Sequence, residues 1–129
     1  SWSGLNVDMG NPHAVVFVDD LADAGKLFEP PVHDEATYPD GVNVEFLKRT
    51  GAGRVAMRVH ERGSGETRSC GTGACAAMVA TQLQDESPRG TPYEVDVLGG
   101  RLFFEWTDED RVLMTGPAEL VAEGFVTVP

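Results

Sequence analysis

Several short stretches of the chain alternate between apolar and polar residues, or run apolar, as strands of a half-buried sheet do. In GLNVDMGNPHAVVFVDD we expect a strand, a turn at Gly10-Asn11-Pro12 and a second strand through Val15 to Val18. Residues 42–50 and 54–62 flank Gly51-Ala52-Gly53, which predicts a hairpin with a three-residue glycine loop. The C-terminal third predicts a hairpin over 93–106 closed at Gly99-Gly100, and late strands within 111–120 and 124–129.

One stretch has the pattern of a buried helix. Apolar residues of 71–84 are spread around most of the helical circumference, which is typical of a helix enclosed on nearly all sides: Ala74, Ala77, Met78, Val79, Ala80 and Leu83. A short helix is expected within 20–31, ended by Pro30 and Pro31, and a loop over 33–43. The sum is one α+β domain over 1–129, with mostly antiparallel strands wrapped around one central buried helix.

Composition narrows the function only by exclusion. The net charge of −11 argues against a nucleic-acid partner, which would need a basic surface. No apolar run is long enough for a membrane span, and no leader is visible, so we expect no membrane partner. Two cysteines are too few for a disulfide scaffold and favour a reducing, cytoplasmic location. The acidic run Asp108-Glu109-Asp110 is interpreted as a solvated turn, so no metal site is predicted.

Cys70 lies between glycine-rich turns, directly before Gly71-Thr72-Gly73 and the predicted helix. A helix N-terminus leaves backbone N–H groups without partners and carries partial positive charge. There a thiol is expected to have a lowered pKa, and the same N–H groups can bind a carboxylate or phosphate. Taken alone, Cys70 would be interpreted as a small buried apolar residue, but the flanking glycines favour the reactive interpretation. Cys75 lies inside the apolar helix, where the structural interpretation is preferred.

Four blocks of this sequence resemble the diaminopimelate epimerase family in order and spacing: GNPH, GVNVEF, ERGSGET and SCGTGACAA. The resemblance covers essentially the whole chain but only the second half of a family member. It implies an enzyme of two similar α/β halves, with the substrate in the cleft between them and one cysteine at a helix mouth in each half. The other cysteine, in a Cys-Gly-Asn block, belongs to the first half, and the chain, which starts at Ser1 without Met, is expected to be a piece of something longer.

The resemblance also implies roles. The reaction would interconvert LL- and meso-2,6-diaminopimelate, in lysine and peptidoglycan-precursor synthesis, with two thiols and no cofactor. Cys70 would be one acid/base thiol, Glu61 would tune its proton affinity, and His13 would do the same for the cysteine of the other half. Gly71 and Thr72 would bind the reacting carboxylate, and the distal end of the substrate would be bound by Asn11, Asn43 and Arg62. Expected partners are the substrate and the N-terminal half. A homodimer with a second copy is a further arrangement that the resemblance allows.

Each of these residues also has a plain structural interpretation. Asn11 could be a turn residue before Pro12, Asn43 a polar group at a strand end, and Arg62 the surface partner of Glu66. His13 could be a hydrogen-bonded core histidine. His33 and His60 are interpreted as structural.

Three other functions stay open. A proline or hydroxyproline racemase shares the two-thiol plan and the Cys-Gly-Thr-Gly turn, although the ERGSGET run and the Asn43 block favour diaminopimelate. A carboxylate-binding module without activity is the second. The third is a cysteine hydrolase with His13 as base, which is disfavoured because the resemblance places Glu61 beside the thiol. The 129 residues alone are expected to be inactive, since they supply only one of the two thiols.

Overall fold

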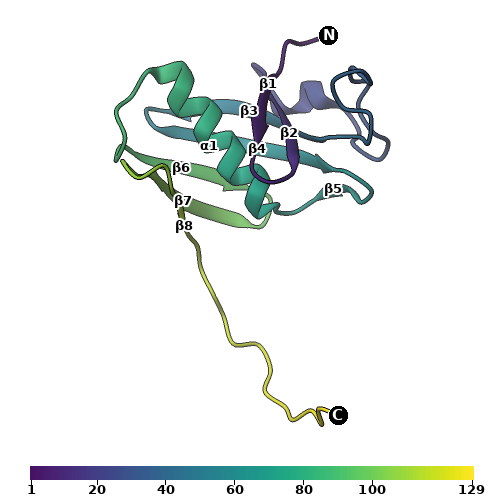
Figure 1. The fold of residues 1–129 in the computed structure, drawn as a ribbon, viewed down its shortest axis with the longest axis vertical. Coiled ribbons are helices and arrows are strands. Elements are labelled where there is room, and N and C mark those ends of the chain that lie inside the picture. The colour runs from purple at the N-terminus through teal and green to yellow at the C-terminus, as the bar shows by residue number, and fades with distance from the viewer.

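A mixed sheet of eight strands carries one long helix on one face (Figure 1). The computed structural model describes residues 1–129. The strands are β1 (Leu5–Asp8), β2 (Pro12–Phe17), β3 (Asn43–Gly51), β4 (Arg54–Glu61), β5 (Gly65–Thr67), β6 (Pro92–Val97), β7 (Gly100–Trp106) and β8 (Val112–Thr115). The helices are the 3-10 helix η1 (Leu21–Ala24) and α1 (Gly71–Asp85).

The strand order is β1-β2-β3-β4-β6-β7-β8, with β5 paired to β4. Most pairs are antiparallel, as predicted, but β2–β3 and β4–β6 are parallel. A parallel pair needs a long crossover. Residues 18–42 form the first, and residues 62–91, which contain β5 and α1, form the second.

The two central hairpins are confirmed with small differences in their turns. The β3–β4 connection is Ala52-Gly53, with a register shift between Arg49 and Gly51. Gly53 has φ +64°, a left-handed conformation that glycine adopts without steric cost. In the second hairpin Gly100 is already the first residue of β7.

Two predicted elements are wrong or reduced. The strand expected within 124–129 does not form: from residue 116 onward the chain has no regular structure and extends away from the sheet (Figure 1). A strand needs a neighbouring strand to bond its backbone, and this segment has none. The helix expected within 20–31 is only η1, which ends at Gly25 with φ +66°.

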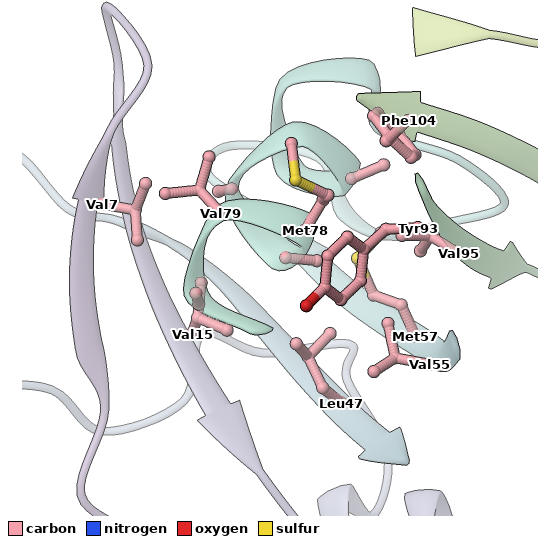
Figure 2. Packing of buried hydrophobic residues seen from close by; sticks show 14 of the residues in the cluster. Val7, Val15, Leu47, Val55, Met57, Met78, Val79, Tyr93, Val95 and Phe104 are labelled. Carbon is pink, nitrogen blue, oxygen red and sulfur yellow. The ribbon is translucent and has the colours of Figure 1, made fainter. Parts of the chain in front are cut away.

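The helix expected at 71–84 is confirmed, one residue longer. It contacts strands on both sides of the sheet's centre, from β1 to β7, and nine of its residues are buried. The prediction of a helix enclosed on nearly all sides is wrong at Leu83, which is 55% exposed. Figure 2 shows Met78 and Val79 of α1 among the buried side chains of the strands.

Alternate residues along each strand face opposite sides of the sheet. On the helix side lie Val15 of β2, Leu47 of β3, and Met57 and Val59 of β4. A smaller cluster, including Val16, Val44 and Phe46, covers the other face under the 18–42 crossover. This alternation decides which polar residues near the strand ends face the N-terminus of α1. No helix has the length and apolar character to cross a membrane.

Candidate active site

Three adjacent strands bring distant residues to one end of the sheet. His13 of β2 is the register partner of Asn43 of β3, and Val44 is the partner of His60 on β4. His13 is two residues before Val15 on β2, and Glu61 is two residues after Val59 on β4. The side chains of His13 and Glu61 therefore belong to the helix side of the sheet. His13, Asn43 and Glu61 form a row of polar residues. This row lies at the end of the core, next to the first turn of α1.

Cys70 is the N-cap of α1. Its backbone is extended, and its Sγ accepts a hydrogen bond from the Gly73 N–H at 3.4 Å. A side-chain acceptor at this position satisfies one of the unpaired N–H groups of the first turn. Gly71 and Thr72 are exposed, and the N–H of neither can have an intrahelical partner. The arrangement has the sulfur and two free donors side by side, as the sequence predicted.

The predicted lowering of the Cys70 pKa is wrong. Partial burial raises the pKa of the Cys70 thiol, and the nearby carboxylate of Glu61 raises it further. The hydrogen bonds from the Gly73 N–H and the Thr72 hydroxyl act in the opposite direction but do not outweigh burial. In this structure Cys70 is therefore a protonated thiol at neutral pH, a proton donor rather than a ready thiolate.

Glu61 is held in place by Thr67. The last residue of β4, it is half-buried, and its Oε1 accepts a hydrogen bond from the Thr67 hydroxyl at 2.6 Å. The β4–β5 hairpin sets this contact, because Glu61 pairs with Gly65 and Thr67 with Val59. The carboxylate is close enough to the sulfur to oppose its ionisation.

His13 is wholly buried and bonded at both ring nitrogens. Nδ1 lies 2.6 Å from Oε1 of Glu45, itself wholly buried, and Nε2 lies 3.0 Å from Oδ1 of Asn11. The Asn11 amide then donates from Nδ2 to the Thr72 hydroxyl at 3.3 Å. The Thr72 hydroxyl is 3.7 Å from the Cys70 sulfur. A continuous chain of polar contacts thus joins Glu45 to the thiol.

Gly73 is crowded by both ends of that chain. A Cβ at this position would lie 2.6 Å from Oε1 of Glu45 and 3.1 Å from the sulfur of Cys70. Only glycine leaves room for the buried carboxylate and the thiol on either side of the first helical turn. The second glycine of Cys-Gly-Thr-Gly thus has a steric reason in this fold.

Asn43 and Arg62 lie on the β3–β4 side of the same row. Asn43 donates from Nδ2 to the Pro12 carbonyl at 3.0 Å and accepts the Arg62 N–H at 2.8 Å. One amide hydrogen and one lone pair of Asn43 remain for a ligand. The Arg62 side chain is exposed, lies across Gly41 and donates to the Asp40 carbonyl at 3.3 Å. It does not pair with Glu66, whose carboxylate binds Arg58 instead.

The residues predicted to be structural lie outside this row of contacts. Cys75 is half-buried in α1, and burial raises the pKa of its thiol. His33 contacts the Pro31 carbonyl at 2.9 Å, and His60 is 2% exposed. The acidic run 108–110 is a turn, with Asp110 paired to Arg89. No group of three or more His, Cys, Asp or Glu side chains is placed to hold a metal ion.

Sequence reasoning missed Glu45. The signal was available, because Glu45 has the parity of Leu47 and so places a carboxylate on the buried side of an apolar strand. A buried carboxylate requires a partner, and His13 lies on the neighbouring strand. That neighbour could not be read from the sequence, because the parallel pairing of β2 and β3 joins residues 32 positions apart.

The family model described as diaminopimelate epimerase matches residues 5–121. The chain belongs to the diaminopimelate epimerase family. The diaminopimelate epimerase of Streptomyces coelicolor is 59% identical over 129 residues, covering 95% of this chain and 45% of the relative. That of Bacillus licheniformis is 46% identical over 122 residues, covering 94% and 43%. The chain therefore spans less than half the length of these family members.

Solved structures support the fold of this family member. A structure titled as a predicted epimerase from Pseudomonas aeruginosa is similar with a TM-score of 0.55 at 19% identity, covering 88% of this chain and 44% of that one. A phenazine biosynthesis PhzF-family protein of Enterococcus faecalis has a TM-score of 0.51 at 17% identity, covering 84% and 39%. At these identities the likeness concerns the fold, a curled mixed sheet with one helix.

Proposed function

We propose that this chain is the C-terminal half of a cytoplasmic diaminopimelate epimerase that uses two thiols and no cofactor. The observation that carries the proposal is the helix mouth, where Cys70, two unpaired N–H groups and Glu61 meet at one place. Family membership supplies the substrate class. The N-terminal half, with the second thiol, is the partner that completes the cleft.

Inversion at the α-carbon then needs one group on each face. One sulfur, as thiolate, takes the α-proton, and the electron pair of the broken C–H bond remains on the carbon. A thiol on the opposite face gives its proton to that carbon and becomes the new thiolate. Because burial and the Glu61 carboxylate keep Cys70 protonated, it is the donor in the direction that begins with the other thiolate. The roles exchange in the reverse direction.

The negative charge that develops on the substrate needs donors. The N–H groups of Gly71 and Thr72 at the start of α1 would bind the reacting carboxylate, where charge grows in the transition state. The distal end would contact Asn11, Asn43 and Arg62, with the guanidinium binding its carboxylate. Glu61 would accept and return the Cys70 proton, and His13 would act on the thiol of the other half.

A second candidate, the proline-type racemase, lacks a use for the exposed Arg62 beside Asn43, because its substrate has no distal carboxylate. Rates of the full-length enzyme on LL-diaminopimelate and on proline distinguish the two. We expect conversion of the first only. Conversion of proline alone would replace the diaminopimelate proposal with this one.

The role of Glu61 is tested by Glu61→Gln in the full-length enzyme. The change keeps the size and the Thr67 contact but removes the proton-accepting carboxylate. We expect kcat to fall by about 100-fold or more with KM changed by less than about threefold, as for a group that acts in proton transfer. Progress curves from LL-diaminopimelate measure both constants. A change confined to KM would make Glu61 a binding residue.

A further inference from the structure

Glu45 is a buried ionisable group that the reaction above does not use. It is the third residue of β3 and lies wholly buried against the first turn of α1. We propose that Glu45 is a positioning residue that fixes His13 as a hydrogen-bond donor at Nε2. The inference rests on the proposed function, since it assigns a role to the histidine expected to act on the other thiol.

The hydrogen-bond pattern leaves Nε2 one role. Asn11 donates from Nδ2 to Thr72, so its Oδ1 is left to accept from the His13 ring at 3.0 Å. A carbonyl oxygen cannot donate, so Nε2 carries the hydrogen in this orientation of the Asn11 amide. The remaining proton of the pair lies between Nδ1 and Oε1 of Glu45, which are 2.6 Å apart. In either position of that shared proton, Nε2 stays a donor.

Burial places the shared proton on Glu45. Its Oε2 has no hydrogen-bond partner, and an ionised carboxylate with an unpaired buried oxygen is costly. Burial accordingly raises the pKa of the Glu45 carboxyl, and the His13 contact opposes this only in part. A protonated Glu45 donates to Nδ1, which excludes the tautomer with hydrogen on Nδ1. The same logic holds a histidine in one tautomer where a carboxylate orients a catalytic imidazole.

The ionisable groups around the pair do not offer an alternative partner for His13. These groups are Glu61 at the end of β4, Cys70 at the start of α1 and Tyr38 of the first crossover. Tyr38 bonds to Asn6 and Glu61 accepts from Thr67. Glu45 is the group in hydrogen-bond contact with Nδ1.

The consequence for the reaction concerns the thiol of the other half. Once the Asn11 carbonyl gives up this hydrogen bond to the thiol of the other half, an imidazole with hydrogen on Nε2 stabilises the thiolate by donating to it. The opposite tautomer would present a lone pair and favour the thiol. Glu45 would therefore contribute to forming the second thiolate without touching it.

The test compares three full-length enzymes: wild type, Glu45→Met and Glu45→Gln. Methionine has similar volume and no donor, whereas the glutamine amide can still donate to Nδ1. We expect kcat of Glu45→Met to fall by about 10- to 100-fold, with KM within about threefold and the low-pH limb of the kcat profile moved to higher pH. We expect Glu45→Gln to retain kcat within about threefold of wild type. Nitrogen-15 NMR of the His13 ring should show hydrogen on Nε2 in wild type and Glu45→Gln, and a mixture of tautomers in Glu45→Met.

Glu66→Met is the matched control, because it removes a carboxylate bound to Arg58 in the same domain. It is expected to lower the melting temperature without moving the pH profile or the His13 signals. An unchanged tautomer in Glu45→Met overturns the inference, and so does equal loss of kcat in Glu45→Met and Glu45→Gln. If the wild-type enzyme does not epimerise diaminopimelate, the proposed function fails, and the NMR comparison still decides the role of Glu45.

Discussion

At the scale of single residues, the Cys70 sulfur receives opposing influences. The helix N-terminus donates a hydrogen bond to it, while partial burial and the carboxylate of Glu61 oppose its ionisation. The general association of helix mouths with reactive thiolates assumes exposure and a positive neighbour, and here the charged neighbour is negative. The position of a thiol on a helix is therefore not enough to give the direction of its pKa.

This balance predicts how Cys70 is alkylated. Only the thiolate reacts, and Glu61→Gln removes a charge that raises the pKa of Cys70. At pH 8, below that pKa, the thiolate fraction rises when the pKa falls, so alkylation of Cys70 should accelerate by about two- to fivefold. Peptide mapping after brief iodoacetamide treatment measures it. Cys75 is the internal control, because burial and Cys70 are the causes that raise its pKa. It should react more slowly than Cys70 and be unaffected by the substitution.

At the scale of elements, Arg58 fastens the first crossover to the sheet. Its guanidinium binds Glu66 of β5 through Nε at 2.7 Å and Nη2 at 3.1 Å. It also donates to the carbonyls of Leu21 and Gly25, at the two ends of η1. One side chain of β4 thus ties the second crossover, where β5 lies, to the irregular chain of the first.

The Arg58–Glu66 pair predicts an acid-sensitive contribution to stability. The hydrogen bonds from Arg58 hold the pKa of Glu66 below its usual value. A lowered pKa in the folded state stabilises above the unfolded value and is lost as the pH falls through the folded value. Glu66→Gln should therefore lower the free energy of unfolding by about 1 kcal/mol at pH 7, with the difference from wild type shrinking as the pH falls through the lowered pKa of Glu66. Urea unfolding at several pH values checks this. A difference that is constant with pH would assign the effect to packing.

Local sequence patterns determined the elements that depend on neighbours along the chain. The 71–84 helix and the β3–β4 hairpin follow from apolar periodicity and glycine turns, and Cys70 lies at the expected cap. The four sequence blocks also identified Asn11, His13, Asn43 and Glu61 as candidate site residues without knowledge of how their strands pair. What could not be predicted depends on pairing between distant strands. The parallel β2–β3 register created the His13–Glu45 contact, and the absence of a neighbouring strand left 124–129 without regular structure.

At the scale of the whole molecule, the candidate site lies at the N-terminal end of α1 and is open to solvent on its outer side. Cys70, Gly71 and Thr72 are partly or fully exposed, and so is Arg62. A polar substrate held there would be open to water, which weakens the electrostatic interactions that stabilise a developing carbanion. Under the proposed function, these groups would serve one face of a substrate carbon. The family members span more than twice this length.

This geometry predicts what the 129 residues do when expressed alone. They contain their own helix, sheet and core, so they should fold and melt cooperatively. They should not convert LL- to meso-diaminopimelate, because two-base inversion needs a second thiol on the opposite face. Cys75 cannot supply it, since it lies more than one helical turn beyond the mouth, at the fifth residue of α1. Mass spectrometry must show the preparation free of host epimerase, and circular dichroism must show it folded. Adding the separately expressed N-terminal half should restore part of the activity if the halves dock without a covalent link. Epimerisation by the folded chain alone would contradict the assignment of one thiol to each half.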